Sequence, residues 1–496
     1  MRNERPIQDG GVGELVARDY QARLARAVLL EQAGINPYPA EAPTITHLTS
    51  QLLKEFVSLE GQTVSIAGRM VSKRVHGGIT FGHVEDQSGQ IQSVFAQSRL
   101  GKDHYTLIRD AFDPGDFVGV TGVLGKTNTG EVSVFAKETH MLTKALRQPP
   151  EQVQDAEVQQ RQRYLHTLVE RKARERFVVR SQIVQYMREY FLNTLGCLEV
   201  ETPILDSTYG GALARPFVTH HQALGTDFFL RIANELYLKR MTVGGYYGGV
   251  FEFARDFRNE GMDRTHNPEF TQLELYKPFW DYKRMMEMAE NLMSSIVGRI
   301  HGTMKIQYGS HTIDFTPPWR RLSIYDGIRE KLDIEPTTIS EETLRRFAHE
   351  YDVEFTNRGE TLLKLFEKLW EEELIQPTFI CDYPAETSSL AKRHRDDPTL
   401  TERFELFVGG METMNAYSEL NDPRDQRQRF EHEQQKRLAG DRETMEFDED
   451  FILSQEYGMP LQAGIGIGID RWVMLLTNTT HIRQVIYFPT LRPKSR

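Results

Sequence analysis

Hydrophobic and polar positions along the chain predict regions of different structure. From about residue 14 to 31, apolar side chains such as Leu24, Val28 and Leu29 recur with helical spacing, and the run GINPYPAEAP then ends that helix. From 64 to 142 the pattern changes to short strands punctuated by turn residues. Residues 148–176 are polar and poor in apolar side chains, which predicts a linker followed by a basic helix. The remaining residues mix helices with strands joined as hairpins, which excludes a sheet built from βαβ units.

The strand-rich region predicts a small barrel. Five short strands in about 80 residues are typical of an OB-type fold, which often binds single-stranded nucleic acid. A barrel with a purely structural role is the alternative that the pattern leaves open.

The segment 251–276, FEFARDFRNEGMDRTHNPEFTQLELY, predicts two strands joined by a polar loop. Successive side chains of a strand point to opposite faces, so Leu273 and Leu275 face an apolar core. The other face of the second strand carries Phe270, Gln272, Glu274 and Tyr276. A phenylalanine among these charged side chains does not make a sheet more soluble. We therefore expect a ligand-binding hairpin.

A glycine strand lies near the C-terminus, in AGIGIGIDRWVMLLTN at 463–478. Its isoleucines share one face, and Gly464, Gly466 and Gly468 share the other, where bare backbone can lie against a planar ligand. Arg471 follows at the start of the next helix. The spacing G-x-G-x-G differs from the dinucleotide-binding G-x-G-x-x-G, which disfavours a Rossmann domain.

A second polar hairpin is predicted at 404–420, around Gly409–Gly410. Three glutamates lie in or beside this otherwise apolar hairpin, at 405, 412 and 419. A solvated sheet face is one reading of them. Near a polyphosphate, the same carboxylates would instead be ligands for Mg²⁺, which takes one or two carboxylates together with phosphate oxygens.

Composition limits the classes of protein to which the chain can belong. The chain has 496 residues with 71 acidic and 60 basic side chains, a net charge of −11, so nucleic acid must meet local basic surface. A chain of this length favours roughly three domains. Cys197 and Cys381 lack metal-type spacing and are expected to be buried as small hydrophobic residues. The N-terminus does not look like a signal peptide, and no apolar run approaches ~20 residues, so we expect a cytoplasmic protein without membrane contact.

Taken together, these motifs resemble those of the class II aminoacyl-tRNA synthetases, and among them the lysyl enzymes. FRNEGMDRTHNPEFTQLELY is similar to the family's second motif, GIGIGIDR to its third, and GCLEVETPIL (196–205), with Pro203 at a dimer interface, to its first. The resemblance implies an α+β fold, with an antiparallel catalytic sheet flanked by helices, an N-terminal OB-fold anticodon-binding barrel and a homodimer. It also implies that lysine is activated by ATP to lysyl-adenylate, with release of pyrophosphate, and transferred to the 3′ end of tRNA(Lys).

On this basis we expect a helical extension at 1–61, the OB-fold domain at 62–147, a linker at 148–176 and the catalytic domain at 177–496. The resemblance makes Arg258 and Arg471 catalytic: Arg258 meets the α-phosphate and the lysine carboxylate, and Arg471 the γ-phosphate. Phe270 would stack on adenine with Arg471 on its other side. Residues expected to bind ATP are Arg258, His266, Asn267, Phe270, Glu405, Gly468 and Arg471. Those expected to bind L-lysine are Glu235, Arg258, Glu260, Glu274, Tyr276, Asn415, Tyr417 and Glu419.

Three further assignments follow from the resemblance. Glu405 and Glu412 would hold Mg²⁺, and Glu235 and Glu419 would flank the ammonium of lysine. Residues matching positions that read anticodon bases are Arg74, Phe81, Gln92 and Glu131. Glu412 has the opposite strand parity to Asn415, Tyr417 and Glu419, so a bulge or kink is expected between Glu412 and Asn415.

Three rival functions fit these residues less well. An aspartyl or asparaginyl ligase is disfavoured because Glu235 and Glu419 would repel an aspartate side chain. A catalytically dead tRNA-binding paralogue would have lost the arginines or the Glu405/Glu412 pair. A relative that modifies proteins would lack the barrel. Tyr417 stands where the lysyl enzymes usually have phenylalanine.

Overall fold

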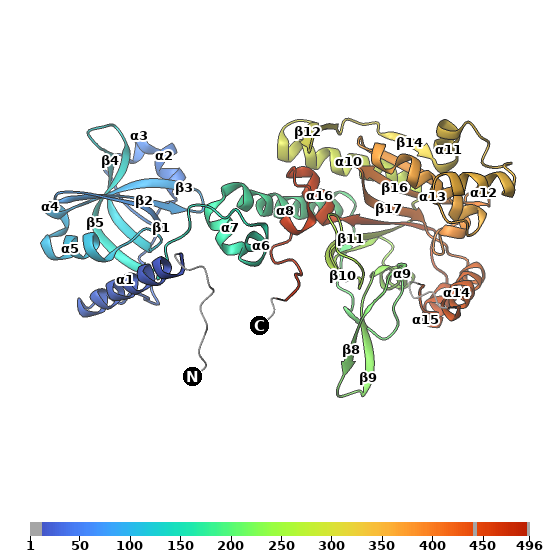
Figure 1. The fold of residues 1–496 in the computed structure, drawn as a ribbon, viewed down its shortest axis with the longest axis horizontal. Coiled ribbons are helices and arrows are strands. Elements are labelled where there is room, and N and C mark those ends of the chain that lie inside the picture. Colours follow the sequence, from blue (N-terminus) through green and yellow to red (C-terminus); the bar gives the residue numbers. More distant parts are fainter. Residues whose placement is uncertain (1–11, 440–443, 494–496) are drawn as a thin grey trace. The chain divides into compact units, whose positions relative to one another are not determined.

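The computed structural model describes residues 12–439 and 444–493, with the side chains of 12–16 left aside. The chain divides into two compact units, Met1–Val153 and Gln154–Arg496. Each unit has its own hydrophobic core. Figure 1 shows the helices and strands of each unit.

The N-terminal unit is a closed five-stranded barrel with helices around it. The strands follow the order β1-β2-β3-β5-β4. Their bounds are β1 Thr63–His76, β2 Ile79–Asp86, β3 Gly89–Ala96, β4 Phe117–Lys126 and β5 Val132–Thr143. The helices are α1 Val12–Gln32, α2 Thr49–Lys54, α3 Phe56–Leu59, α4 Gln97–Leu100 and α5 Lys102–Ala111. The predicted N-terminal helix and OB-type barrel are thus confirmed. Gly122 lies at an irregularity between β4 and β5, and a Cβ there would come within 2.2 Å of the Phe135 carbonyl oxygen, which is why glycine is needed.

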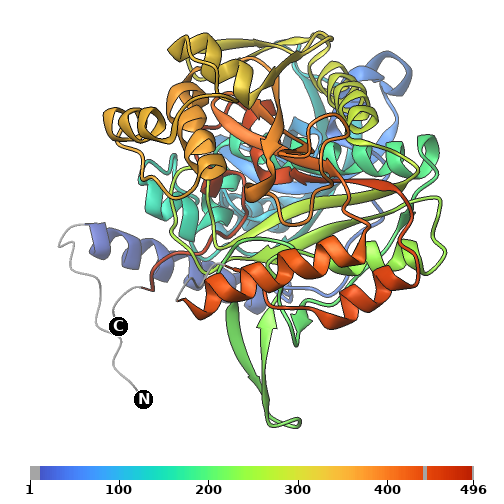
Figure 2. The same ribbon diagram turned by 90° about the vertical axis from the view of Figure 1, so that its right-hand side faces the viewer.

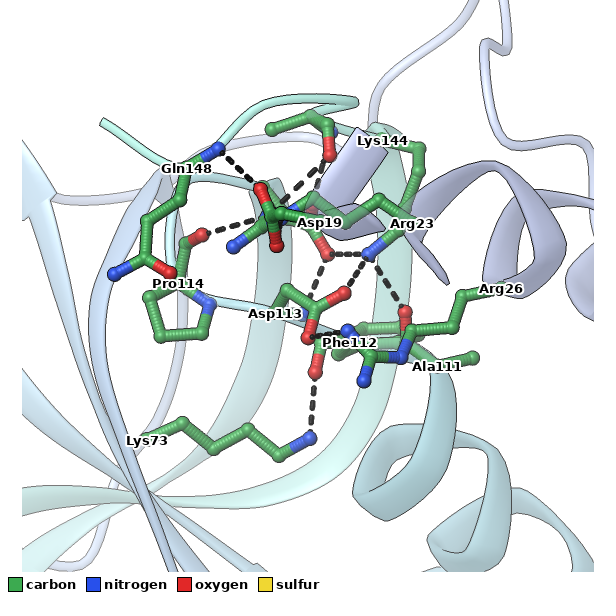
Figure 3. A network of polar contacts seen from close by, with 12 residues as sticks. Asp19, Arg23, Arg26, Lys73, Ala111, Phe112, Asp113, Pro114, Lys144 and Gln148 are labelled. Carbon is green, nitrogen blue, oxygen red and sulfur yellow. Dashed lines mark hydrogen bonds and ion pairs between the residues drawn. The ribbon is translucent and has the colours of Figure 1, made fainter. Parts of the chain in front are cut away.

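A buried ion network connects α1 to the barrel (Figure 3). The Lys144 side chain is fully buried, and its Nζ lies 2.5 Å from a carboxylate oxygen of Asp113 and 2.8 Å from one of Asp116. Arg26 of α1 pairs with Asp113 at 2.8 Å, and Arg23 donates to the Pro114 carbonyl at 3.0 Å. Buried charges are tolerated when they are paired and hydrogen-bonded, so this network fixes α1 against the loop before β4.

The C-terminal unit is built on an eight-stranded sheet in the order β14-β15-β16-β17-β18-β11-β10-β6. The bounds are β6 Leu198–Glu199, β10 Val250–Phe257, β11 Glu269–Pro278, β14 Arg320–Ser323, β15 Thr378–Pro384, β16 Leu400–Val408, β17 Met411–Ser418 and β18 Gln462–Gly468. The two outermost pairs, β14 with β15 and β6 with β10, are parallel, and the five pairs between them are antiparallel. The expected antiparallel α+β sheet is therefore confirmed, with a parallel strand added at each edge.

Helices and smaller hairpins surround this sheet. The helices are α6 Ala156–Arg161, α7 Arg163–Val169, α8 Arg171–Glu189, α9 Glu235–Val243, α10 Tyr282–His301, α11 Ile324–Leu332, α12 Glu341–Glu350, α13 Arg358–Trp370, α14 Pro423–Leu438, α15 Glu449–Glu456 and α16 Ile469–Leu476, with a π-helix at Tyr190–Thr194 and 3₁₀ turns at Glu371–Glu373, Ala385–Thr387 and Ile482–Gln484. The small strands are β7 Leu205–Asp206, β8 Phe217–His221, β9 Thr226–Leu230, β12 Lys305–Tyr308 and β13 His311–Asp314. The β8–β9 hairpin extends away from the sheet (Figures 1 and 2). The segment 148–176 contains α6, α7 and the start of α8, and the domain boundaries expected from the sequence stay predictions.

One face of the large sheet packs on α8, α10 and α16 to form the main core. Leu273, Leu275, Ile465 and Ile467 lie there at 0–1% exposure, which confirms the apolar faces predicted for the two strands. Both cysteines are free and buried in the same core, again as expected. The opposite face is consequently left to the polar side chains of β10, β11, β16, β17 and β18.

The predicted irregularity in β17 is present. Leu406 pairs with Met414 and the next residue, Phe407, pairs with Glu412, so Thr413 is the extra residue of a bulge. Its hydroxyl donates to the Leu406 carbonyl at 3.0 Å. The bulge reverses the side-chain parity, which brings Glu412 to the same face as Asn415 and confirms the expectation.

In the described part of the chain, none of the helices is long and apolar enough to cross a bilayer.

Candidate active site

A cavity of about 400 Å³ opens on the polar face of the large sheet. It gathers side chains from strands β11, β16, β17 and β18, from the loop after β10, and from the start of α9 and α16. The predicted residues that line it are Glu235, Arg258, Glu260, His266, Asn267, Phe270, Glu274, Tyr276, Glu405, Glu412, Asn415, Tyr417, Gly468 and Arg471. Only Glu419 among the predicted residues of this unit is absent from its wall, since it is fully buried behind it.

Arg258 and Phe270 occupy one part of the wall, where the β10–β11 hairpin ends. Arg258 follows the last residue of β10, and its guanidinium lies 5.1 Å from the centroid of the Phe270 ring. Below it, Asp256 is fully buried, and burial raises its pKa to about 7 despite the opposing charges of Arg231 and Arg258. The expectation that adenine lies between Phe270 and Arg471 stays a prediction.

Arg471 stands at a second part of the wall, near the N-terminus of α16. One of its nitrogens lies 2.5 Å from the Glu412 carbonyl oxygen and 3.2 Å from the Glu412 carboxylate. Another lies 3.0 Å from Nε2 of His266, whose Nδ1 is 2.8 Å from Asp263. The loop residue His266 is thus held between a carboxylate and a guanidinium.

Glu405 and Glu412 lie close together between these groups. Burial and the charge of Glu412 together raise the pKa of Glu405 to about 7, although the charge of Arg403 opposes both effects. The Arg403 guanidinium donates to Glu405 at 2.6 Å and to the Asn415 side chain at 3.2 Å. Two carboxylates whose mutual repulsion favours proton uptake are a suitable donor pair for a divalent cation, which would relieve that repulsion. Among residues 12–439 and 444–493 no cluster of three or more His, Cys, Asp or Glu could hold a metal.

The far end of the cavity is acidic and aromatic. Glu235 is the first residue of α9, where the helix N-terminus favours a carboxylate, and it accepts a hydrogen bond from the Tyr417 hydroxyl at 2.6 Å. Glu274 accepts from the Tyr276 hydroxyl at 2.9 Å and from the Gln272 amide. Burial raises the pKa of Glu274 to about 8, with further contributions from Glu235 and Asp256. The carboxylates of this end can hold a cation. Tyr417 belongs to the same end through its hydroxyl, which donates to Glu235.

Glu419 lies beneath this end and is paired with a residue that the sequence reasoning missed. Lys239, one turn after Glu235 on α9, forms ion pairs with both Glu235 and Glu419. Its side chain is 1% exposed and that of Glu419 is fully buried. The i, i+4 spacing of Glu235 and Lys239 was a signal in the sequence, although nothing there linked Lys239 to Glu419.

The glycine strand makes room for these side chains. A Cβ on Gly464 would come within 2.3 Å of both Glu419 and Tyr276, and one on Gly466 within 2.8 Å of Glu274. Gly468, by contrast, has no atom closer than 3.7 Å to such a Cβ and leaves open backbone beside Arg471. The flat surface that we expected for a planar ligand is therefore present at Gly468, while Gly464 and Gly466 accommodate the acidic pocket.

The predicted anticodon residues lie on the barrel of the N-terminal unit. Arg74 pairs with Phe81 across β1 and β2, so the two share one face. The Gln92 amide donates to Glu131 at 2.8 Å, and His83, which pairs with Gln92 across β2 and β3, contacts the same carboxylate at 3.0 Å. His83 was not predicted, although it has the same strand parity as Phe81.

Comparisons with known proteins agree over nearly the whole chain. Residues 155–492 match the family of class II tRNA synthetases (D, K and N), and residues 64–142 match the OB-fold nucleic acid binding domain. A lysine–tRNA ligase of Clostridium botulinum (strain Hall) is 46% identical over 475 residues, which cover 94% of each chain. Those of Christiangramia forsetii and Syntrophomonas wolfei are 45% and 44% identical, over 96% of this chain and 86% and 97% of theirs.

Proposed function

The chain belongs to the class II lysine–tRNA ligases, and from this premise we propose how its cavity binds and activates lysine. Enzymes of this kind join lysine to tRNA(Lys) at the cost of ATP, so both small substrates must meet in one site. The observation that carries the proposal is the polarity of the cavity, which has arginines at one end and buried carboxylates with tyrosines at the other.

The acidic end is proposed to bind the lysine substrate. Glu235 and Glu419 provide negative charge for the side-chain ammonium, and the rings of Tyr276 and Tyr417 enclose it. Lysine carries a second ammonium on Cα, which we assign to Glu274, another carboxylate at the acidic end. Asn415 and Glu260 complete the set of residues that we assign to lysine. An aspartate side chain would be repelled here, since charges near 4 Å interact by ~4 kcal/mol at an effective dielectric of ~20.

The basic end is proposed to bind ATP and to stabilise the developing charge. Arg258 is placed to reach both the lysine carboxylate and the α-phosphate, and Arg471 with His266 to reach the outer phosphates. Phe270, Asn267 and the bare backbone of Gly468 would surround adenine. The attack of a carboxylate on phosphorus requires no protein nucleophile, so aligned substrates and fixed guanidinium groups supply the rate.

Magnesium is proposed at Glu405 and Glu412. Their proximity and the raised pKa of Glu405 fit a cation that completes its shell with phosphate oxygens. When bound, the ion would neutralise charge on the triphosphate. Arg403 already pairs with Glu405 and would position that carboxylate. We assign Arg403 no direct contact with the phosphates.

We further propose that the barrel reads the anticodon of tRNA(Lys), with Phe81 stacking on a base and Arg74, Gln92 and Glu131 contacting base edges. A homodimer is supported by exposed apolar side chains on two short strands, Leu198 of the edge strand β6 and Leu205 of β7, at 46% and 48% exposure. A cytoplasmic location is consistent with this activity.

The decisive experiment is lysine-dependent exchange of pyrophosphate into ATP, with aspartate and asparagine as controls. We expect exchange with lysine alone, followed by charging of tRNA(Lys) with lysine. Exchange driven equally by aspartate would contradict the assignment of the acidic pocket, and sedimentation at low concentration would test the dimer.

A further inference from the structure

A row of hydrogen-bonded side chains crosses the barrel face that carries the proposed anticodon residues. It joins neighbouring strands of the order β1-β2-β3-β5 and the residue directly before β5, and its members are Ser72, His83, Gln92, Ser133 and Glu131. Ser72 pairs with His83 across β1 and β2, His83 with Gln92 across β2 and β3, and Gln92 with Ser133 across β3 and β5. Residues paired in this way place their side chains on the same face of a sheet, so the row is a product of strand register.

The carboxylate of Glu131 sets the direction of the hydrogen bonds, because it can only accept. One of its oxygens lies 3.0 Å from Nε2 of His83, so this nitrogen carries the proton. The other accepts from the Gln92 amide nitrogen at 2.8 Å, which leaves the Gln92 carbonyl to accept from the Ser133 hydroxyl at 2.9 Å. Ser72 Oγ accepts from the His83 backbone N–H at 3.3 Å and can donate to Nδ1 at 2.9 Å. The row therefore has one consistent arrangement of donors and acceptors.

The row is anchored in the barrel and open to solvent at Glu131. Ser133 and Gln92 are buried, at 0% and 5% exposure, and the His83 side chain is 25% exposed. The Glu131 side chain is 48% exposed, and its carboxylate keeps acceptor capacity beyond the two hydrogen bonds that it receives. A rigid set of donors thus supports an acceptor that a ligand can reach.

We propose that His83 is a positioning residue for Glu131 and thereby helps to set the base specificity of the barrel. Its Nε2–H holds the carboxylate as an acceptor for a base whose Watson–Crick edge carries an N–H donor, as the imino group of uracil does. The corresponding N3 of cytosine is itself an acceptor and leaves the carboxylate without a partner. Phe81 lies two residues before His83 on the same face of β2, where a stacked base would present its edge to Glu131. The inference rests on the proposed function of the barrel.

Removal of His83 has two expected consequences. Glu131 would lose one of the two donors that hold its carboxylate, and the rotamer freedom that it regains must be lost again when RNA binds. A mobile carboxylate can also turn away from an unfavourable base. We therefore expect both weaker binding and weaker discrimination between bases. The alternative is that His83 contacts RNA itself or only supports the barrel, in which case its effect does not depend on Glu131.

Binding of an anticodon stem-loop to the full chain tests this dependence. The probes are the stem-loop with anticodon UUU, which pairs with the lysine codon AAA, and three derivatives with one anticodon uridine replaced by cytidine. Glu131→Ala identifies the position that this carboxylate reads, since the preference for uridine should disappear there. His83→Ala should weaken binding of the UUU stem-loop about tenfold and reduce the preference at that same position at least threefold. In the Glu131→Ala background, His83→Ala should change neither quantity by more than twofold, because coupled residues are not additive.

A rescue variant and a control accompany these measurements. His83→Gln keeps a side-chain N–H near the place of Nε2 and should recover most of the binding and of the preference. His140→Ala removes an exposed histidine of β5 that lies 3.9 Å from Glu138, and it should change neither.

Three results would overturn the inference: no loss in His83→Ala, the same loss with and without Glu131, or a loss shared equally by all four stem-loops. A Glu131→Ala variant that keeps the full preference at every position would also overturn it. If instead the unmodified protein does not distinguish the UUU stem-loop from its cytidine derivatives, it is the proposed reading of the anticodon that fails.

Discussion

The binding of lysine should release a measurable amount of protons from the buried carboxyl of Glu274. Burial, with the charges of Glu235 and Asp256, raises its pKa to about 8, so at pH 7 the free protein holds a proton on it in about 90% of molecules. A substrate ammonium at about 4 Å would favour the ionised form by ~4 kcal/mol at an effective dielectric of ~20. That corresponds to about three pKa units and would lower the pKa to about 5. Lysine binding at pH 7 should therefore release close to one proton.

Calorimetric titration with lysine in two buffers of different ionisation enthalpy measures this release. Glu274→Gln keeps the shape of the side chain and should reduce the release to near zero. Glu367→Gln is the matched control, because Glu367 is a glutamate whose pKa burial also raises but which lies outside the main cavity. Equal release from the unmodified protein and from Glu274→Gln would refute the reasoning.

The raised pKa of Glu274 also makes the free energy of unfolding depend on pH. Between the ordinary pKa of 4.5 and the folded value of about 8, the folded protein holds a proton on Glu274 that the unfolded chain has lost. Stability then falls as pH rises, by about 1.4 kcal/mol per pH unit from this one group. Glu274→Gln should remove that slope between pH 5.5 and 7. If the urea midpoints of the unmodified protein and of Glu274→Gln changed with pH in the same way over this range, the assignment would be contradicted.

Three further predictions follow from the described contacts. Glu235→Gln and Glu419→Gln should each raise the KM for lysine by ~10²-fold with little change for ATP, and an unchanged lysine KM would remove that residue from recognition. Phe81→Ala should weaken tRNA(Lys) binding by ~1–3 kcal/mol in a filter assay, while a matching loss in pyrophosphate exchange would show that it supports the fold. Lys144→Met strands two buried aspartates and should destabilise the N-terminal unit by ~3–5 kcal/mol in urea, and a midpoint within error of the unmodified protein would count against the network.

Much of the fold could be predicted because its signals are local. The period of two in 251–276 and in the isoleucine–glycine strand identified which side chains face the core, and Leu273 and Ile465 lie there. The turn residues between the five strands of the barrel predicted those strands equally well. The helical content of 154–176 was less evident, because its short helices carry few apolar side chains and depend on tertiary contacts such as Arg163 with the Arg483 and Ile486 carbonyls.

The electrostatics of the cavity could not be predicted in the same way. The resemblance named Glu235 and Glu419, but the depth of Glu419 and its pairing with Lys239 depend on how α9 packs against residues 180 positions away in the chain. Likewise, the pKa of Asp256 follows from its burial beneath Arg258, and strand parity alone says nothing about burial depth. Such properties arise from desolvation, which only the assembled structure determines.

The bulge at Thr413 shows how one backbone irregularity serves both ends of the cavity. In a regular strand, Glu412 and Asn415 would face opposite sides of the sheet. The extra residue lets Glu412 reach Arg471 at the basic end, while Asn415 and Tyr417 keep the parity of the acidic end. Gly464 and Gly466, on the neighbouring strand, then supply the space that the side chains of the acidic end require. The separation of a basic end from an acidic end is therefore a property of strand register, and the charged residues could not produce it on a regular sheet.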